Sequence, residues 1–139
     1  MTTDKTLAVF GGVDGLVATV GIVLGVGIAS HGTGPVWHAV LALFVAEGIG
    51  MSVSEFLSDN ETGLRGASIM GAATGLPILA VGLPWTVLGR SAALVASLLV
   101  AVVLAGAIAV LRGGGCKGWA QTFGVLAGVS VVAALSGAL

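Results

Sequence analysis

Long apolar stretches separated by short polar connections make up most of the chain. Each stretch reaches the roughly 20 residues that a helix needs to cross the hydrocarbon of a bilayer. We expect helices because alternating strand patterns are absent and a backbone in lipid must satisfy its own polar groups. The pattern predicts an all-α membrane protein in which residues 1–139 form one five-helix transmembrane domain. The predicted spans are residues 7–30, 36–58, 66–85, 91–111 and 118–138.

The connections between the spans contain the residues that end helices. Each carries glycine, proline or charged side chains, and none is long enough for a separate soluble domain. Their sequences are SHGTGP (30–35), SDNETGLRG (58–66), PWTVLGRS (84–91) and RGGGCKG (112–118).

The composition supports a membrane protein. The 139 residues are 57% hydrophobic and 8% charged, which leaves too few polar groups to cover a soluble domain. The 24 glycines favour helices that approach one another closely. A net charge of −1 without a basic run excludes a nucleic-acid-binding surface. At the N-terminus, Asp4 lies beside Lys5, so we expect the first span to be retained and not cleaved as a signal peptide.

Basic residues near the span ends predict the orientation. With five spans, four of the five basic residues fall on one side, and Arg90 falls on the other. Since basic residues are enriched in cytoplasmic connections, we expect a cytoplasmic N-terminus. The four residues on the N-terminal side are Lys5, Arg65, Arg112 and Lys117.

Carboxylates inside the apolar spans are the candidate chemistry. A charged side chain in the hydrocarbon costs from roughly 2.5 to more than 10 kcal/mol, so one that persists usually faces a bundle interior or water. Asp14 lies in the first predicted span. In the second, Glu47, Met51 and Glu55 are spaced at i, i+4 and i+8, along one stripe of a helix. Carboxylates with a thioether suit a borderline divalent metal such as Fe²⁺, Mn²⁺ or Zn²⁺ better than an alkali ion.

Carboxylates also exchange protons, so these residues predict a route on which protons compete with metal. Other interpretations stay open at this point. Glu55 with Asp59 and Glu61 is alternatively the solvated end of a helix. Met51 is alternatively core filler, and Asp14 a polar cap at the membrane interface.

Small residues on the first span predict a close helix contact. Two small-xxx-small pairs occur there, Gly11 with Gly15 and Gly21 with Gly25. We expect another helix on the face that carries Gly21, Gly25 and Asp14, with the same helix of a second chain as one candidate. Two chains would then bring two Asp14 side chains together and supply four to six ligands.

The two N-terminal spans resemble the vacuolar iron transporter family. GGVDGLVATVGIVLGV (11–26) resembles its first-span signature, and GMSVSEFLS (50–58) is similar to its second, in which a methionine precedes an acid by four residues. The Gly/Ala-rich sequence at 65–84 resembles its third span. The resemblance implies five transmembrane helices per chain, a homodimer with the ion route between the chains, and exchange of Fe²⁺ or Mn²⁺ for protons. It places the ion-route aspartate and methionine on Asp14 and Met51, and the following acid on Glu55.

Two departures from the family pattern change what is expected. The family usually has an acid two turns before the methionine, where this chain has Leu43, so the role of Glu47 rests on its chemistry alone. The connection DNETGLRG (59–66) replaces a cytoplasmic metal-collecting domain found in many members. Metal capture then depends on Glu55, Asp59 and Glu61, and the short connection leads us to expect a prokaryotic plasma membrane.

The leading hypothesis is a homodimeric, proton-coupled exporter of divalent transition metal, with Asp14, Glu47, Met51 and Glu55 as metal-binding residues. The alternatives are a small proton-coupled exporter of organic cations and a non-transporting membrane scaffold subunit. Catalytic motifs such as GxSxG, HExxH or a P-loop do not occur, so we expect neither an enzyme nor a resident cofactor.

The remaining candidates lie near the membrane surfaces. His31 and His38 flank GTGPVW on the outer side, where a metal exit site is an alternative to ordinary loop histidines. Trp37, Trp85 and Trp119 are expected to anchor the helices at the membrane interfaces.

Overall fold

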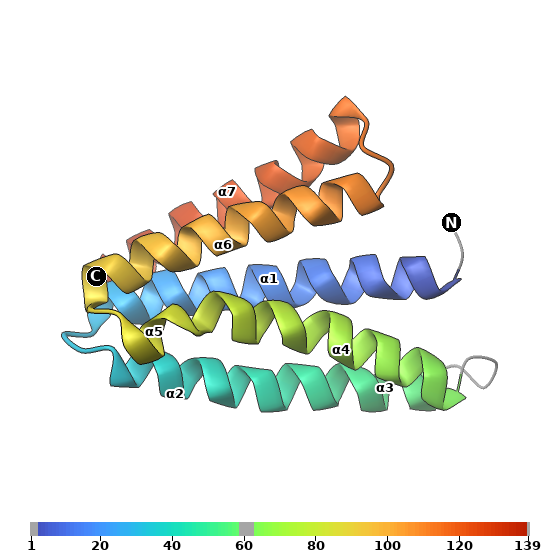
Figure 1. Cartoon of the computed structure of the whole chain (residues 1–139), viewed down its shortest axis with the longest axis horizontal. Helices are drawn as coiled ribbons and strands as arrows, with labels where there is room; N and C mark the ends of the chain where they lie inside the picture. Colours follow the sequence, from blue (N-terminus) through green and yellow to red (C-terminus); the bar gives the residue numbers. More distant parts are fainter. Residues whose placement is uncertain (1–2, 59–62, 139) are drawn as a thin grey trace.

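The computed structural model describes residues 3–58 and 63–138, and these residues are almost entirely helical (Figure 1). The connection between the second and third spans, with Asp59 and Glu61, therefore lies outside the described residues. The elements in chain order are α1 (Thr3–Ala29), α2 (Gly34–Leu43), the π-helix η1 (Phe44–Ile49), α3 (Gly50–Ser58), α4 (Gly63–Gly82), α5 (Pro84–Val87), α6 (Arg90–Leu111) and α7 (Cys116–Ala138).

Five helical stretches among the described residues are long and apolar enough to cross a membrane. The second consists of α2, η1 and α3 in direct succession over Gly34–Ser58, and the third joins α4 to α5 over Gly63–Val87. The expectation of an all-α protein with five apolar helices of spanning length is thus confirmed. The first helix begins at Thr3 and the last at Cys116, a few residues earlier than expected.

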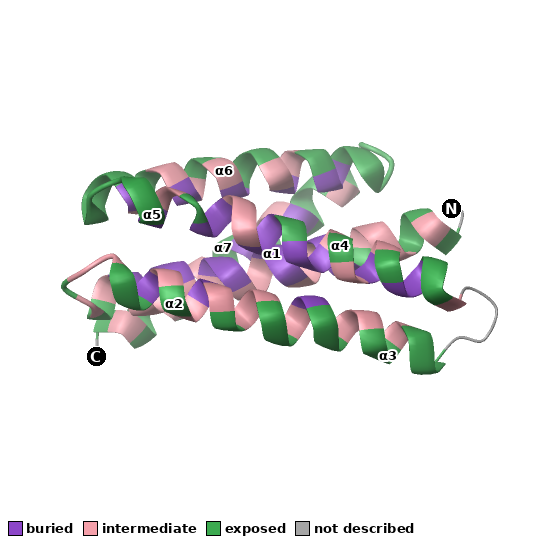
Figure 2. Cartoon of the chain, turned by 60° about the horizontal axis from the view of Figure 1, so that its bottom comes forward, coloured by how far each residue is buried: buried purple, intermediate pink, exposed green. Residues whose placement is uncertain are grey.

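Helix α1 lies at the centre of the bundle. It packs against α4 on one side and against α6 and α7 on another; α2 also contacts α1, while η1 and α3 lie outside α4 (Figure 1). Buried positions are accordingly frequent on α1 and α4 and sparse on α3 and on the outer face of α6 (Figure 2). Their side chains form one apolar core around Leu16, Val20, Val23, Ile78 and Val81. The remaining apolar surface lies where hydrocarbon would surround the bundle.

Glycine permits the close approach of α1 to α4. A Cβ at Gly15 would overlap the backbone carbonyl of Thr74, and one at Gly11 would lie 2.8 Å from the Thr74 hydroxyl oxygen and 2.9 Å from the Met70 carbonyl oxygen. Thr19 and Thr74 are buried here, and each donates its hydroxyl to the carbonyl four residues earlier in its own helix, so no polar atom is left open to lipid.

The other small residues of α1 meet a helix of the same chain. A Cβ at Gly21 or Gly25 would lie 3.8 Å from atoms of Val129 and Ala133 in α7, and one at Gly137 would lie 2.5 Å from the Gly25 carbonyl oxygen. Gly21 and Gly25 therefore face α7 of the same chain, and their contact with a second copy of this helix stays a prediction. The pattern correctly indicated a close helix contact, but the spacing of small residues does not identify the partner.

Trp85 is part of the core and does not anchor the protein at a membrane interface as expected. Its side chain is 2% exposed, and its indole N–H donates to the Ser97 hydroxyl at 3.0 Å. Ser97 donates in turn to the Val81 carbonyl at 2.6 Å. The short helix α5 turns Trp85 inward, which a belt residue at the end of a straight span would not do. Trp119, by contrast, is 39% exposed.

Arg90 lies at the same end of the bundle as α5 and binds the end of α1. Its guanidinium donates to the carbonyls of Gly27 and Ile28, at 3.0 and 2.8 Å. These carbonyls belong to the last turn of α1, where backbone acceptors have no helical partner and a positive charge complements the helix dipole. Arg90 therefore serves a structural role at this end.

We predict that Gly15→Ala destabilises the protein. The added methyl group meets backbone that cannot move independently of α4, and such overpacking costs about 1–3 kcal/mol, against the roughly 1 kcal/mol that alanine gains over glycine inside a helix. Thermal unfolding of the purified protein in detergent should show a lower midpoint. Gly124→Ala is the matched control, because a Cβ there has no neighbour within 4 Å. A midpoint for Gly15→Ala at or above that of the wild type would contradict this packing.

We also predict that Ser97→Ala lowers stability by about 1–3 kcal/mol, because it leaves the buried indole N–H of Trp85 without an acceptor. The same unfolding measurement detects the change. Ser91→Ala, at an exposed position of the same helix, should leave the midpoint unchanged. Equal midpoints for the two variants would show that the Trp85 hydrogen bond contributes nothing.

Candidate metal-transport site

Asp14 lies inside α1 and is partly buried. It is on a different side of the helix from Gly11 and Gly15, because that side is occupied by α4. Helix α1 continues for 11 residues before Asp14 and 15 after it, counting from the helix bounds at Thr3 and Ala29. Asp14 therefore lies within the helix and not at its end, and its roles as an ion ligand or as a polar residue at the membrane interface both stay predictions.

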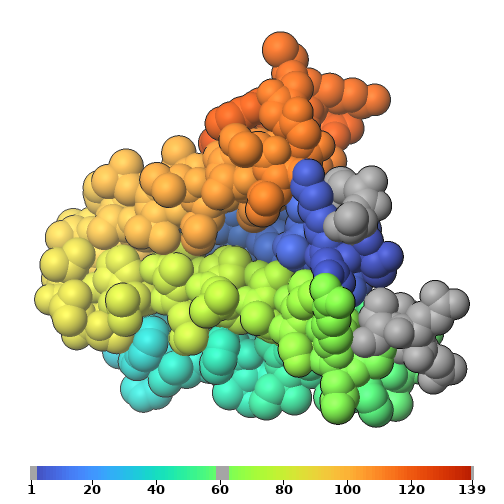
Figure 3. All heavy atoms as spheres, turned by 45° about the vertical axis from the view of Figure 1, so that its right-hand side comes forward, coloured from blue at the N-terminus to red at the C-terminus, as the bar shows by residue number. Residues whose placement is uncertain are grey.

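Asp14 faces an opening of about 350 Å³ that the sequence did not reveal. The opening lies between the first turns of α1 and the end of α6, where the α6–α7 turn stands away from α1 (Figure 3). Arg112, at the end of α6, lines the same opening. Its remaining lining consists of Thr6, Val9, Phe10 and Val13.

Glu47 lies in the π-helix η1, which interrupts the second span. A π turn closes its hydrogen bonds over five residues, and such turns are frequently found at functional sites. The π turn buries Gly48 against α4, where a Cβ would lie 3.7 Å from the Cα of Gly75. Phe44, at the start of the turn, also packs its ring on Gly75. Periodicity could not predict η1, because an apolar sequence supports either type of turn.

Met51 and Glu55 follow on α3. With Glu47 they form a series spaced by four residues. All three side chains are partly buried, between exposed residues such as Val53 and the α4-facing Ser52. Met51 is not a member of the apolar core, contrary to its interpretation as core filler. The common stripe expected from the i, i+4, i+8 spacing stays a prediction, because Glu47 lies in the π-helix.

One chain does not bring these candidate ligands together. Helix α4 lies between α1 and α3, so Asp14 is on one side of it and the stripe of the second span on the other (Figure 1). Within residues 3–58 and 63–138, no group of three or more His, Cys, Asp or Glu side chains is arranged to hold a metal ion. Among the described residues, Asp14 therefore lies apart from Glu47 and Met51.

The basic residues lie at the two ends of the bundle in the four-to-one division that five successive spans predict. Lys5, Arg65, Arg112 and Lys117 belong to the end where α1 and α4 begin and α6 ends, and Arg90 belongs to the opposite end. Arg65 forms an ion pair with Asp4, which joins the first turns of α4 and α1.

The two histidines are exposed at the Arg90 end. A ring nitrogen of His38 lies 2.8 Å from the Gly34 carbonyl oxygen, within its own helix, and His31 is in the link before α2. The residues that the structure describes contain no cluster that would make them an exit site.

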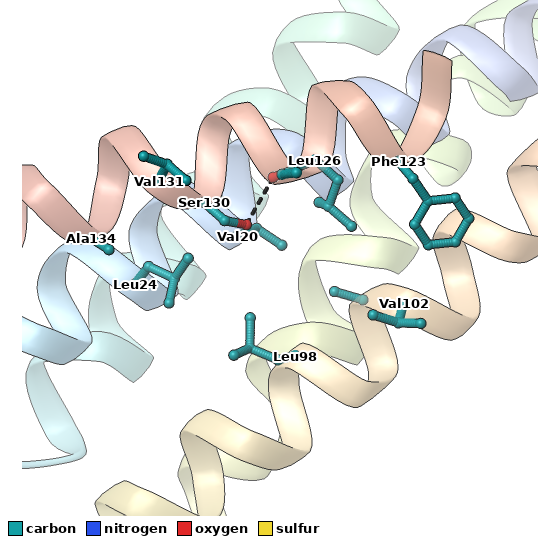
Figure 4. Close-up of a pocket in the computed structure, with 11 residues that line it drawn as sticks. Val20, Leu24, Leu98, Val102, Phe123, Leu126, Ser130, Val131 and Ala134 are labelled. Atoms are coloured by element: carbon teal, nitrogen blue, oxygen red, sulfur yellow. Dashed lines mark hydrogen bonds between the residues drawn. The ribbon is translucent and has the colours of Figure 1, made fainter. Parts of the chain in front are cut away.

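A larger groove of about 510 Å³ between α1, α6 and α7 does not have the chemistry of an ion route (Figure 4). Its lining is apolar apart from Ser130, whose hydroxyl is committed to the Leu126 carbonyl at 2.8 Å. Volume alone therefore does not identify a candidate ion route.

Comparison with known protein families gives one result for this chain. The model of the VIT family matches residues 6–64. Over this region the chain is similar to the VIT family. The match covers Asp14, Glu47, Met51 and Glu55, and it confirms the resemblance seen in the two N-terminal signatures. The chain matches no curated protein and no solved structure. Similarity to the VIT family over residues 6–64 suggests a membrane metal ion transporter, in agreement with the five apolar helices.

Proposed function

We propose that this protein is a homodimeric, proton-coupled transporter that exports divalent transition metal ions such as Fe²⁺ or Mn²⁺ from the cytoplasm. The main support for this proposal is Asp14. It is a partly buried carboxylate along an apolar helix, within the VIT-matching segment and facing an opening. An acid in such a place is costly unless it serves an ion path.

The donor atoms support a transition metal as the cargo. Asp14 and Glu47 offer carboxylate oxygens and Met51 a thioether sulfur, a set that suits borderline divalent ions. Glu55 is one helical turn nearer than Met51 to the end of α3, where it would meet the ion first on the N-terminal side of the membrane.

The ligand count supports the homodimer. One described chain holds no cluster of three acidic, histidine or cysteine side chains, and α4 separates its candidate residues. In a symmetric pair each candidate occurs twice, which supplies enough ligands for an ion held between two chains. The partner's Asp14 is the first such ligand, because it carries the charge that balances a divalent cation.

Proton coupling follows from carboxylate chemistry. A carboxylate ligand must be deprotonated to bind a metal ion, so a proton that binds it releases the metal. Protons entering from the far side would displace the metal there and reset the site. The four basic residues at the N-terminal end favour a cytoplasmic location of that end, and hence export toward the Arg90 end.

One observation supports a second candidate. Phe10 lines the opening at Asp14 and is 57% exposed, and an aromatic ring beside a carboxylate is the arrangement that binds organic cations. A single ring next to Arg112 makes a poor cage, so a metal ion remains our proposal. Transport of a quaternary ammonium ion in place of Mn²⁺ would reverse that choice.

Transport in proteoliposomes tests the proposal directly. We predict that Mn²⁺ movement is accompanied by proton movement in the opposite direction, and that Asp14→Asn and Met51→Ala each abolish both while the dimer stays intact. The readouts are an internal metal indicator and an internal pH indicator. Asp4→Asn is the control for Asp14, because it makes the same chemical change at the start of the same helix, where it removes the ion pair with Arg65 and leaves the opening unaltered. Wild-type transport by both Asp14→Asn and Met51→Ala would reject the site.

Metal binding separates a transporter from a scaffold subunit. Calorimetry of the purified protein with Mn²⁺, Fe²⁺ and Zn²⁺ should give a binding heat that Asp14→Asn removes. A matched control in the second span is Val53→Ala, at an exposed position two residues after Met51. Absence of heat from the wild-type protein with all three metals would favour the scaffold alternative.

A further inference from the structure

Arg112 and Asp14 bear opposite charges and line the same opening, although they are 98 positions apart in sequence (112 − 14) and on different helices. They are not in contact. Among the described residues, Arg65 with Asp4 is the ion pair within 4.0 Å, and Asp14 forms none. The opening therefore has a fixed carboxylate on α1 and a long, flexible cation at the end of α6.

The guanidinium of Arg112 is held by neutral groups. Its Nη2 donates to the Gln121 side-chain oxygen at 2.9 Å and its Nη1 to the Thr122 hydroxyl at 3.3 Å. Neither acceptor neutralises the charge, and the Arg112 residue itself is exposed. One ordinary and one longer hydrogen bond to neutral acceptors on α7 hold the guanidinium at the surface, without a negative charge to compensate it.

The surroundings favour an interaction between the two charges. Val9, Phe10 and Val13 line the opening with apolar surface, and Asp14 is partly buried. Charges separated by apolar groups attract more strongly than the same charges in water. An arginine can also satisfy both oxygens of a carboxylate at once.

We propose that Arg112 is a tethered countercharge for Asp14, which its guanidinium neutralises when no metal ion is bound and releases when one arrives. This rests on the proposed function, because it takes Asp14 as a metal-binding residue. The arginine then competes with the incoming cation and lowers its affinity. It also lowers the cost of keeping the carboxylate ionised in an empty transporter. Arg112 is a positioning residue in this scheme and not a ligand.

Metal affinity tests the proposal. We predict that Arg112→Gln, which keeps a donor for Gln121, tightens Mn²⁺ binding by about two- to fivefold, the range expected for an exposed ion pair. Arg112→Met should tighten it similarly, and Arg112→Lys should keep the wild-type dissociation constant. The gain should shrink as salt is raised, because the competing charge is screened. Calorimetry of the full chain with Mn²⁺ at low and high ionic strength measures each value.

Lys117→Gln is the matched control, since it removes one positive charge at the same end of the bundle from a residue that does not line the opening. Its Mn²⁺ affinity should stay at the wild-type value. Unchanged or weaker binding by both Arg112→Gln and Arg112→Met would overturn the proposal, and so would equal tightening by Lys117→Gln. Loss of binding in Asp14→Asn together with wild-type binding in the Arg112 variants would reject the countercharge alone, whereas wild-type binding in Asp14→Asn would reject the metal site itself.

Discussion

The contact between the backbones of α1 and α4 is the constraint on which the rest of the bundle depends. Hydrocarbon solvates apolar side chains as well as a protein interior does, so helices in a bilayer associate mainly through close packing. Gly11 and Gly15 provide it by exposing the α1 backbone directly to Thr74 and Met70. With one face of α4 occupied in this way, its opposite face takes the second span through Gly71, Gly75 and Gly82, where added side chains would overlap Ser52, Phe44 and Val40.

This packing decides where the acids can lie. Since the glycine side of α1 is filled by α4, Asp14 is directed toward the space left by α6 and α7, which diverge from α1 toward the turn between them (Figure 1). Glu47, Met51 and Glu55 lie beyond α4. The chain thus displays its candidate ligands on two separate surfaces, a sensible arrangement if those surfaces meet their counterparts in a second chain.

Much of the fold could be predicted from the sequence, because hydropathy over 20 residues is a strong signal and short polar connections allow only an up-and-down order. The common stripe of Glu47, Met51 and Glu55 stays a prediction, because Glu47 lies in the π-helix, whose geometry differs from that of an α-helix. Properties set by neighbours could not be predicted. The packing of Gly21 and Gly25 on α7 depends on tertiary structure, and the burial of Trp85, contrary to expectation, depends on the bend at α5. That Arg112 and Asp14 line one opening depends on how α6 packs beside α1, which no local pattern encodes.

The π-helix has a consequence for how this span is compared with its relatives. Because η1 closes its turns over five residues, it accommodates one more residue than an α-helix would between the same two neighbours. Positions before Phe44 are therefore displaced by one step relative to those after Ile49, if the reference is a continuous α-helix. A gap-free sequence alignment of this region would pair Leu43 and Glu47 with residues at different structural positions. Equivalent residues across η1 therefore have to be identified by superposing the backbones.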